Sequence, residues 1–155
     1  MTASITHTRL LPFTLLLLCA MRPVQACWAH AAHRYGVSAE LLYAIARTES
    51  DLNPWAVNRN RNGSRDLGLM QINSGWLPLL AHHGIGEREL MVPCTNIAVG
   101  AWILAGNIQR LGDTWAAVGA YHTPSPRRRR AYIARVSGFV RQPPRARAGD
   151  LRHTP

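Results

Sequence analysis

Acid–base chemistry in this chain must use a small number of carboxyl groups. The 155 residues include eight acids against 18 basic residues, all of them arginine. The acids are Glu40, Glu49, Asp51, Asp66, Glu87, Glu89, Asp113 and Asp150. Glu49 stands seven positions after Leu42 and four after Ile45, so it continues the apolar stripe of a predicted helix. A glutamic acid on an apolar face is suited to protonate a glycosidic oxygen.

The place of Glu49 along that helix points to the same chemistry. Glu49 is close to the C-terminal end, and both the helix dipole and the apolar neighbours there disfavour an ionised carboxylate. We therefore expect Glu49 to hold its proton near neutral pH, although a glutamate at a helix end can also turn outward. Two-carboxylate glycosidases need a partner for the acid. Asp66 is the candidate partner, since Asp51 points elsewhere around the helix, but the sequence favours a mechanism with Glu49 alone.

The elements that must position Glu49 are predicted to be helices joined by loops. Residues 38–50 should form one helix, capped by Ser38 and ended by the turn at Asn53-Pro54. Further helices are expected over residues 94–111, over residues 115–121 and from residue 126 onward, with a loop over residues 59–65. Because no segment shows sustained period-two alternation, we expect a mainly α fold in a single domain.

The N-terminal segment is predicted to be a targeting signal. Residues 10–20 form an apolar run too short to span a bilayer comfortably, and residues 24–26 suit signal peptidase. Cleavage after Ala26 would divide the chain into a signal peptide (1–26), a folded domain (27–140) and a basic, disordered tail (141–155). An uncleaved membrane anchor and a lipid anchor on Cys27 are the alternatives, and both rank lower than export to the periplasm.

Removal of residues 1–26 during export would leave two cysteines, Cys27 and Cys94, in an oxidising compartment. They most simply form one disulfide bond that ties the start of the mature chain to its middle. The three cysteines of the whole chain exclude a four-cysteine zinc site, and the seven histidines include no convincing ligand pair. No metal or cofactor is therefore expected.

Three ordered sequence blocks carry a family resemblance. They are Glu49-Ser50 with Asn53-Pro54 and Ala56, then Gly68-Leu69-Met70-Gln71-Ile72-Asn73, then Ala120-Tyr121. Together, over about residues 28–136, they resemble the soluble lytic transglycosylase family with its lysozyme-like, goose-type domain. The small size and the Cys27-Trp28 start look most like the specialised members that accompany type III and type IV secretion, conjugation and pilus systems.

The resemblance implies cleavage of the β-1,4 bond between N-acetylmuramic acid and N-acetylglucosamine in peptidoglycan strands. Glu49 would serve as acid and then base, while the 6-hydroxyl of muramic acid attacks its own anomeric carbon to give a 1,6-anhydro end. Tyr121 would help to fix the carboxyl group of Glu49. The implied substrate-binding residues are Ser50, Met70, Gln71, Asn73, Tyr121 and His122. Many relatives have asparagine where this chain has His122. Tyr132 is expected to face either the groove or the core.

The arginine run over residues 127–130 opens other interpretations. Charge alone gives affinity for phosphate without specificity, and a DNA-binding module would conflict with the predicted export. The run is expected to be either a solvated helix start or a surface that attracts acidic stem peptides or anionic lipid. A hydrolase that uses Asp66, and an inactive peptidoglycan-binding scaffold that recruits secretion components, remain the alternatives to a transglycosylase.

Overall fold

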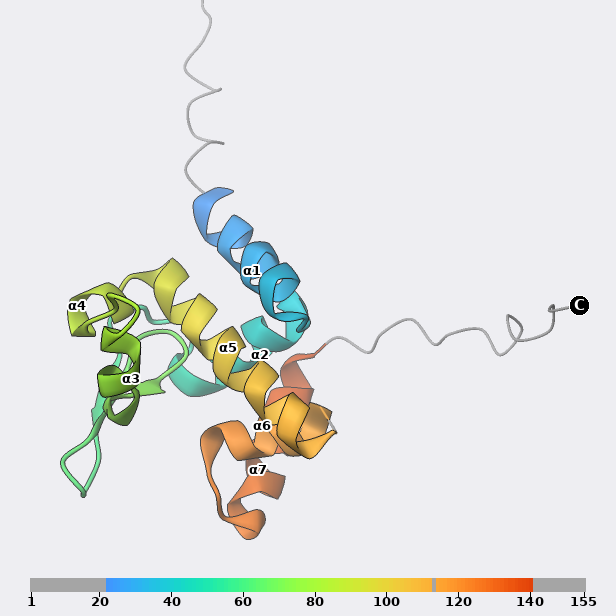
Figure 1. Ribbon diagram of the computed structural model, residues 1–155. Coiled ribbons are helices and arrows are strands. Elements are labelled where there is room, and N and C mark those ends of the chain that lie inside the picture. The colour runs from blue at the N-terminus through green and yellow to red at the C-terminus, as the bar shows by residue number, and fades with distance from the viewer. Residues whose placement is uncertain (1–21, 113, 141–155) are drawn as a thin grey trace, which may run out of the picture.

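The computed structural model describes residues 22–112 and 114–140, and Figure 1 shows them as packed helices with a small hairpin at one edge. The α-helices are α1 (Arg22–Tyr35), α2 (Ala39–Ser50), α3 (Leu77–Ala81), α4 (Glu87–Leu90), α5 (Pro93–Leu111), α6 (Thr114–His122) and α7 (Pro126–Phe139). The short 3-10 helix η1 covers Ser74–Trp76. The predicted mainly α fold is confirmed.

The helix that carries Glu49 is built as its sequence predicts. The side chain of Ser38 accepts a hydrogen bond from the backbone N–H of Leu41 at 3.2 Å, which caps the first turn of α2. Leu42 and Ile45 are fully buried on one face of the helix. At the other end Asp51 adopts a left-handed conformation with φ of 51°, which ends α2 two residues after Glu49.

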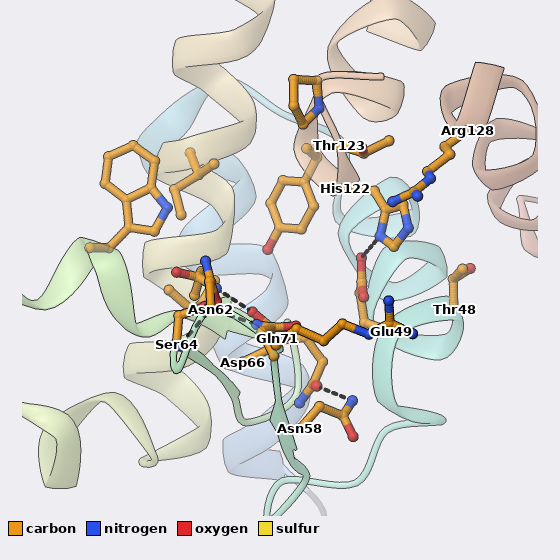
Figure 2. Close-up of a pocket in the computed structure, with 18 of the residues that line it drawn as sticks. Thr48, Glu49, Asn58, Asn62, Ser64, Asp66, Gln71, His122, Thr123 and Arg128 are labelled. Atoms are coloured by element: carbon orange, nitrogen blue, oxygen red, sulfur yellow. Dashed lines mark hydrogen bonds and ion pairs between the residues drawn. The ribbon is translucent and has the colours of Figure 1, made fainter. Parts of the chain in front are cut away.

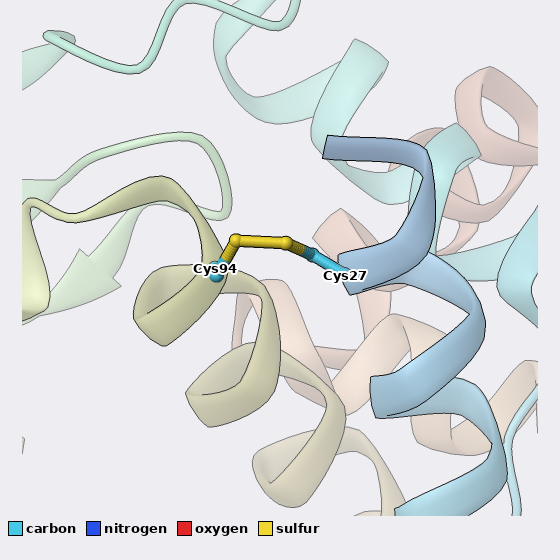
Figure 3. The surroundings of a disulfide bond; sticks show 2 residues. All are labelled: Cys27 and Cys94. Carbon is cyan, nitrogen blue, oxygen red and sulfur yellow. A yellow bond between two sulfur atoms is a disulfide. The ribbon is translucent and has the colours of Figure 1, made fainter. Parts of the chain in front are cut away.

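A disulfide bond joins helices α1 and α5. Cys27 and Cys94 are bonded with their Cα atoms 5.3 Å apart, which confirms the predicted pairing (Figure 3). Helix α1 begins at Arg22 and runs through the predicted cleavage point after Ala26.

A small antiparallel sheet flanks the predicted loop, and residues 60–64 of that loop connect its first two strands. Its strands are β1 (Val57–Arg59), β2 (Arg65–Leu67) and β3 (Ile72–Asn73), in the order β1-β2-β3. Asn58 pairs with Asp66, which in turn pairs with Asn73. The strands have two or three residues each and β1 is exposed throughout, so no alternating pattern could reveal them.

One buried asparagine on α5 fixes the turn between β2 and β3. Asn96 accepts a hydrogen bond from the backbone N–H of Met70 at 2.7 Å and donates to the carbonyls of Leu67 and Leu90 at 2.9 Å. Gly68 has a φ of +74°, and a Cβ there would lie 2.5 Å from the Asn96 side chain. The glycine of the Gly68–Asn73 block is thus required by both its backbone conformation and this contact.

The structure describes the two terminal segments only in part. Residues 1–21 of the predicted signal peptide and residues 141–155 of the predicted tail lie outside the described residues. Among the helices that are described, none has the length and apolar character needed to cross a membrane.

Candidate active site

A cavity of about 800 Å³ lies between the end of α2, the hairpin of β1 and β2, and the start of α7 (Figure 2). Glu49 lines it from α2, Asp66 and Asn58 from the strands, and His122 from the end of α6. The lining is rich in amide, hydroxyl and charged side chains, which suits a ligand with many hydroxyl and amide groups.

The carboxyl group of Glu49 is held by two aromatic rings. The hydroxyl of Tyr132 on α7 donates a hydrogen bond to Oε1 of Glu49 at 2.7 Å. Nδ1 of His122 lies 3.7 Å from the same oxygen, as the dashed line in Figure 2 marks. The two rings stack on each other with centroids 4.5 Å apart and planes 2° apart. The side chain of Glu49 is 12% exposed, so the carboxyl group reaches the cavity from a mostly buried position.

The sequence did not decide whether Tyr132 faces the core or the groove. In the structure Tyr132 contacts both. Its side chain is almost fully buried, yet its hydroxyl contacts the carboxyl group of Glu49 at the edge of the cavity. Burial and the neighbouring charge of Glu49 raise the pKa of Tyr132 well above its ordinary value. The phenol therefore stays protonated and remains a hydrogen-bond donor to Glu49.

Tyr121 differs from its expected role. Its hydroxyl donates to the carbonyl of Met70 at 2.9 Å, and it is Tyr132 that makes the hydrogen bond to Glu49. Burial, together with the charges of Glu49 and Asp66, raises the pKa of Tyr121 well above the usual range for tyrosine. Tyr121 lines the cavity and ties α6 to the Gly68–Asn73 block.

The amide side chain of Gln71 is already engaged within the protein. Nε2 of Gln71 donates to the carbonyls of Ala56 and Gly68 at 3.1 and 2.8 Å, and Oε1 accepts from Asn58 at 2.7 Å. Gln71 lines the cavity with a left-handed backbone, φ of 48°. These bonds occupy both amide hydrogens and leave Gln71 one further acceptor position toward a ligand.

Asp66 and Asn73 form a pair on the sheet side of the cavity. Nδ2 of Asn73 donates to one oxygen of Asp66 at 2.7 Å, and Nδ2 of Asn60 donates to the other oxygen at 3.0 Å. Oδ1 of Asn73 accepts from the backbone N–H of Gly75 at 2.9 Å and begins η1. One oxygen of Asp66 therefore holds the loop of the hairpin, and the other holds the hairpin to β3, the strand that follows it.

Two of the predicted substrate-binding residues lie outside the cavity lining. Met70 is fully buried and packs against Gly100 of α5. The hydroxyl of Ser50 donates to the carbonyl of Leu69 at 2.8 Å. Met70 and Ser50 thus lie behind the residues that line the cavity. There they support the backbone near Glu49 and Gln71, and they do not line the cavity themselves.

Several lining residues were not singled out from the sequence. They are Thr48, Asn58, Asn60, Asn62, Ser64, Trp76, Ile103, Thr123 and Arg135, among others. The asparagine-rich loop after β1 carries three of them, and its repeated Asn and Ser residues were the available signal. No group of three or more histidine, cysteine or acidic side chains able to hold a metal ion occurs in the described part of the chain.

The helical fold and the polar cavity with Glu49 at its edge define a lysozyme-like domain. Residues 26–136 match the family model described as Transglycosylase SLT domain, so the chain belongs to this family. It is accordingly a peptidoglycan lytic transglycosylase, and peptidoglycan is its substrate.

Similar chains occur in several enteric bacteria. Invasion protein IagB of Salmonella typhimurium strain LT2 is 44% identical over 115 residues, which cover 71% of this chain and 72% of IagB. Protein IpgF of Shigella flexneri is 36% identical over 134 residues, covering 84% and 88% of the two chains. A peptidoglycan-binding-like protein of Escherichia coli O157:H7 is 38% identical over 105 residues, 63% of each chain.

The fold has a counterpart among solved structures. An inactive glutamate-to-glutamine mutant of lytic transglycosylase Slt from Pseudomonas aeruginosa superposes with a TM-score of 0.62 at 23% identity. The match covers 75% of this chain and 23% of that chain. It shows that the chain has the lysozyme-like fold of a lytic transglycosylase domain.

Proposed function

We propose that Glu49 is the single acid and base of a reaction that gives 1,6-anhydro ends. Glu49 donates its proton to O4 of N-acetylglucosamine as the bond from that oxygen to C1 of N-acetylmuramic acid breaks. O6 of the same muramic acid then bonds to C1 and returns its proton to Glu49, so that no water is consumed. The observation that carries the proposal is the carboxyl group of Glu49, mostly buried at the cavity edge and held by the Tyr132 hydroxyl.

Other features of the site support this assignment. The solved Slt chain is an inactive mutant in which glutamine replaces a glutamate, the change that removes an acid and keeps its shape. The other carboxyl group that lines the cavity among the described residues, Asp66, has both oxygens bonded to asparagine amides. A substrate that supplies its own nucleophile does not need Asp66 for chemistry.

The substrate-binding roles divide between direct contact and support. We assign direct contact with the sugars to Gln71, Asn73, Tyr121 and His122, all of which line the cavity. Ser50 and Met70 act indirectly, because they hold the chain on which Glu49 and Gln71 stand. This proposed division differs from the expectation that all six residues touch the glycan.

The cellular setting is also part of the proposal. Residues 1–26 would direct export, residues 27–140 would form the catalytic domain in the periplasm, and residues 141–155 would form a basic tail. The disulfide between Cys27 and Cys94 supports an oxidising compartment. We propose that the enzyme makes local openings in the cell wall for a secretion or pilus apparatus, and the likeness to Invasion protein IagB supports a role of this kind.

A hydrolase is the second candidate, because Asp66 lines the same cavity as Glu49. Mass spectrometry of the material released from purified sacculi separates the two. Anhydro-muramic ends support the proposal, reducing ends support the hydrolase, and release of no product contradicts both.

A further inference from the structure

Arginines line the cavity from two opposite parts of the fold. Arg61 stands in the loop between β1 and β2, while Arg128 and Arg135 stand on α7. Figure 1 shows that hairpin and α7 as separate parts of the fold, and Figure 2 shows Arg128 extending from α7 toward His122. Positive charge therefore borders the cavity on both the hairpin side and the helix side.

These arginines form no ion pair with the acids of residues 22–112 and 114–140. Other arginines in this part of the chain do have acidic partners, such as Arg47 with Asp51 at 3.0 Å and Arg65 with Glu87. Within the cavity the carboxyl oxygens of Glu49 and Asp66 are held by Tyr132, His122 and two asparagines. The guanidinium groups of Arg61 and Arg128 are thus available to an anionic ligand.

The chemistry of peptidoglycan identifies the anionic groups that these arginines can bind. The sugar rings themselves are uncharged, and the carboxylates of peptidoglycan all attach through the lactyl ether at C3 of muramic acid. They are either the lactyl carboxylate itself, on strands without peptides, or the carboxylates of the stem peptide. Arginine pairs well with carboxylates because its planar fork donates two parallel hydrogen bonds.

We propose that Arg61 and Arg128, one on each side of the cavity, pair with carboxylates carried on the lactyl substituents of bound muramic acid residues, and that this carboxylate-binding subsite selects peptidoglycan over uncharged glycans. This inference rests on the proposed function, since it names the part of the same substrate that the arginines bind. Arg135 has a different role, because its guanidinium lies 5.7 Å from the ring centroid of Tyr132, within cation–π range. It helps to hold the tyrosine that contacts Glu49.

The decisive experiment compares two double variants of the full chain. Arg61→Gln with Arg128→Gln removes the two cavity arginines, and Arg127→Gln with Arg130→Gln removes the same charge from exposed positions outside the cavity lining. Each is assayed for KM and kcat on strands that bear stem peptides and on strands stripped of them by an amidase. Binding is measured separately, on versions of each protein that also carry Glu49→Gln. The ligands are the same strands and an uncharged chito-oligosaccharide.

We expect the cavity variant to raise KM and weaken strand binding about fivefold, the loss typical of two exposed ion pairs, with kcat unchanged. Binding of the chito-oligosaccharide should not change. If the loss persists on stripped strands, the lactyl carboxylate is the ligand; if it disappears there, the stem carboxylates are. The subsite is refuted if the control variant loses as much, or if affinity for the chito-oligosaccharide falls equally.

These readouts also separate the subsite from the proposed function. A wild-type protein that releases no product from any strand contradicts the proposed function, while the binding measurement still decides on the subsite. Normal release of anhydro products by the cavity variant, with unchanged KM and unchanged binding, contradicts the subsite alone.

Discussion

The two carboxyl groups of the cavity stand on opposite walls and are held in opposite ways. Glu49 projects from the C-terminal end of α2, mostly buried, with a phenol and an imidazole at one of its oxygens. Asp66 projects from β2, where an asparagine amide bonds each of its oxygens. The helix wall therefore presents a carboxyl group to the cavity, while the sheet wall uses one to hold its own loop together.

This difference shows that surroundings, more than residue type, decide what a carboxyl group does. A general acid must gain and lose a proton, so its oxygens have to remain accessible to the substrate. Each oxygen of Asp66 instead accepts a hydrogen bond within the sheet wall, one from Asn60 in the hairpin loop and one from Asn73 on β3. Substitutions on each wall can test whether the helix wall carries the catalytic acid and the sheet wall uses its carboxyl group only to hold its own structure.

The largest effect is expected from Glu49→Gln. Glutamine keeps the shape but removes the proton that the leaving oxygen needs, so release of soluble fragments from sacculi should fall at least about a thousandfold. The thermal unfolding midpoint should change little. Glu40→Gln, which removes an exposed acid at the other end of α2, is the matched control and should keep wild-type turnover.

The next effect concerns the two tyrosines. Tyr132→Phe removes the donor to Glu49, and a hydrogen bond to a charged group is worth enough to lower kcat about tenfold to a hundredfold. Tyr121→Phe removes a bond to the Met70 carbonyl, so its effect on kcat should be smaller. Steady-state kinetics on soluble glycan strands would measure both, and an equal loss in kcat would contradict the separate roles.

A smaller effect is expected from Asp66→Asn on the sheet wall. The new amide would face the donors of Asn60 and Asn73, so we expect a loss of about 1 kcal/mol in unfolding free energy. Turnover should remain within about threefold of wild type. Denaturant unfolding and sacculus digestion measure the two quantities. Loss of turnover as complete as for Glu49→Gln would instead make Asp66 a catalytic residue.

The smallest effect appears at alkaline pH. The unfolded chain loses tyrosine protons near pH 10, while burial raises the pKa of Tyr121 and Tyr132 in the folded chain. The folded state therefore binds more protons there, and its stability falls as the pH rises past 10. At pH 10 the loss is less than about 1 kcal/mol for each tyrosine. Denaturant unfolding should show a shallower decline from pH 8.5 to 10 for Tyr132→Phe, and an unchanged decline would contradict the shift.

Much of the helix wall could be predicted from the sequence. Ser38 and the apolar stripe through Leu42 and Ile45 are local signals, because each acts within one or two turns of its own helix. The position of Glu49 followed from the same stripe. The disulfide also followed from a count of cysteines in a predicted exported chain.

The sheet wall and the exact partners of Glu49 could not be predicted in this way. Strands of two or three residues carry no periodicity, and the pairing of Asp66 with Asn73 depends on the packing of Asn96 beneath them. Tyr132 reaches Glu49 across 83 positions of sequence, a contact that only the packing of α7 on α2 creates. The resemblance named Tyr121, which bonds the Met70 carbonyl instead.

The proposed mechanism requires that Glu49 act without water and without a second carboxylate. Digestion of purified sacculi in water enriched in oxygen-18, followed by mass spectrometry of the new muramic ends, examines this requirement at the bond that is cleaved. We predict anhydro ends that carry no oxygen-18. Reducing ends that carry one labelled oxygen for each bond cleaved would contradict the mechanism and would assign the attack to water, with Asp66 as the group that activates it.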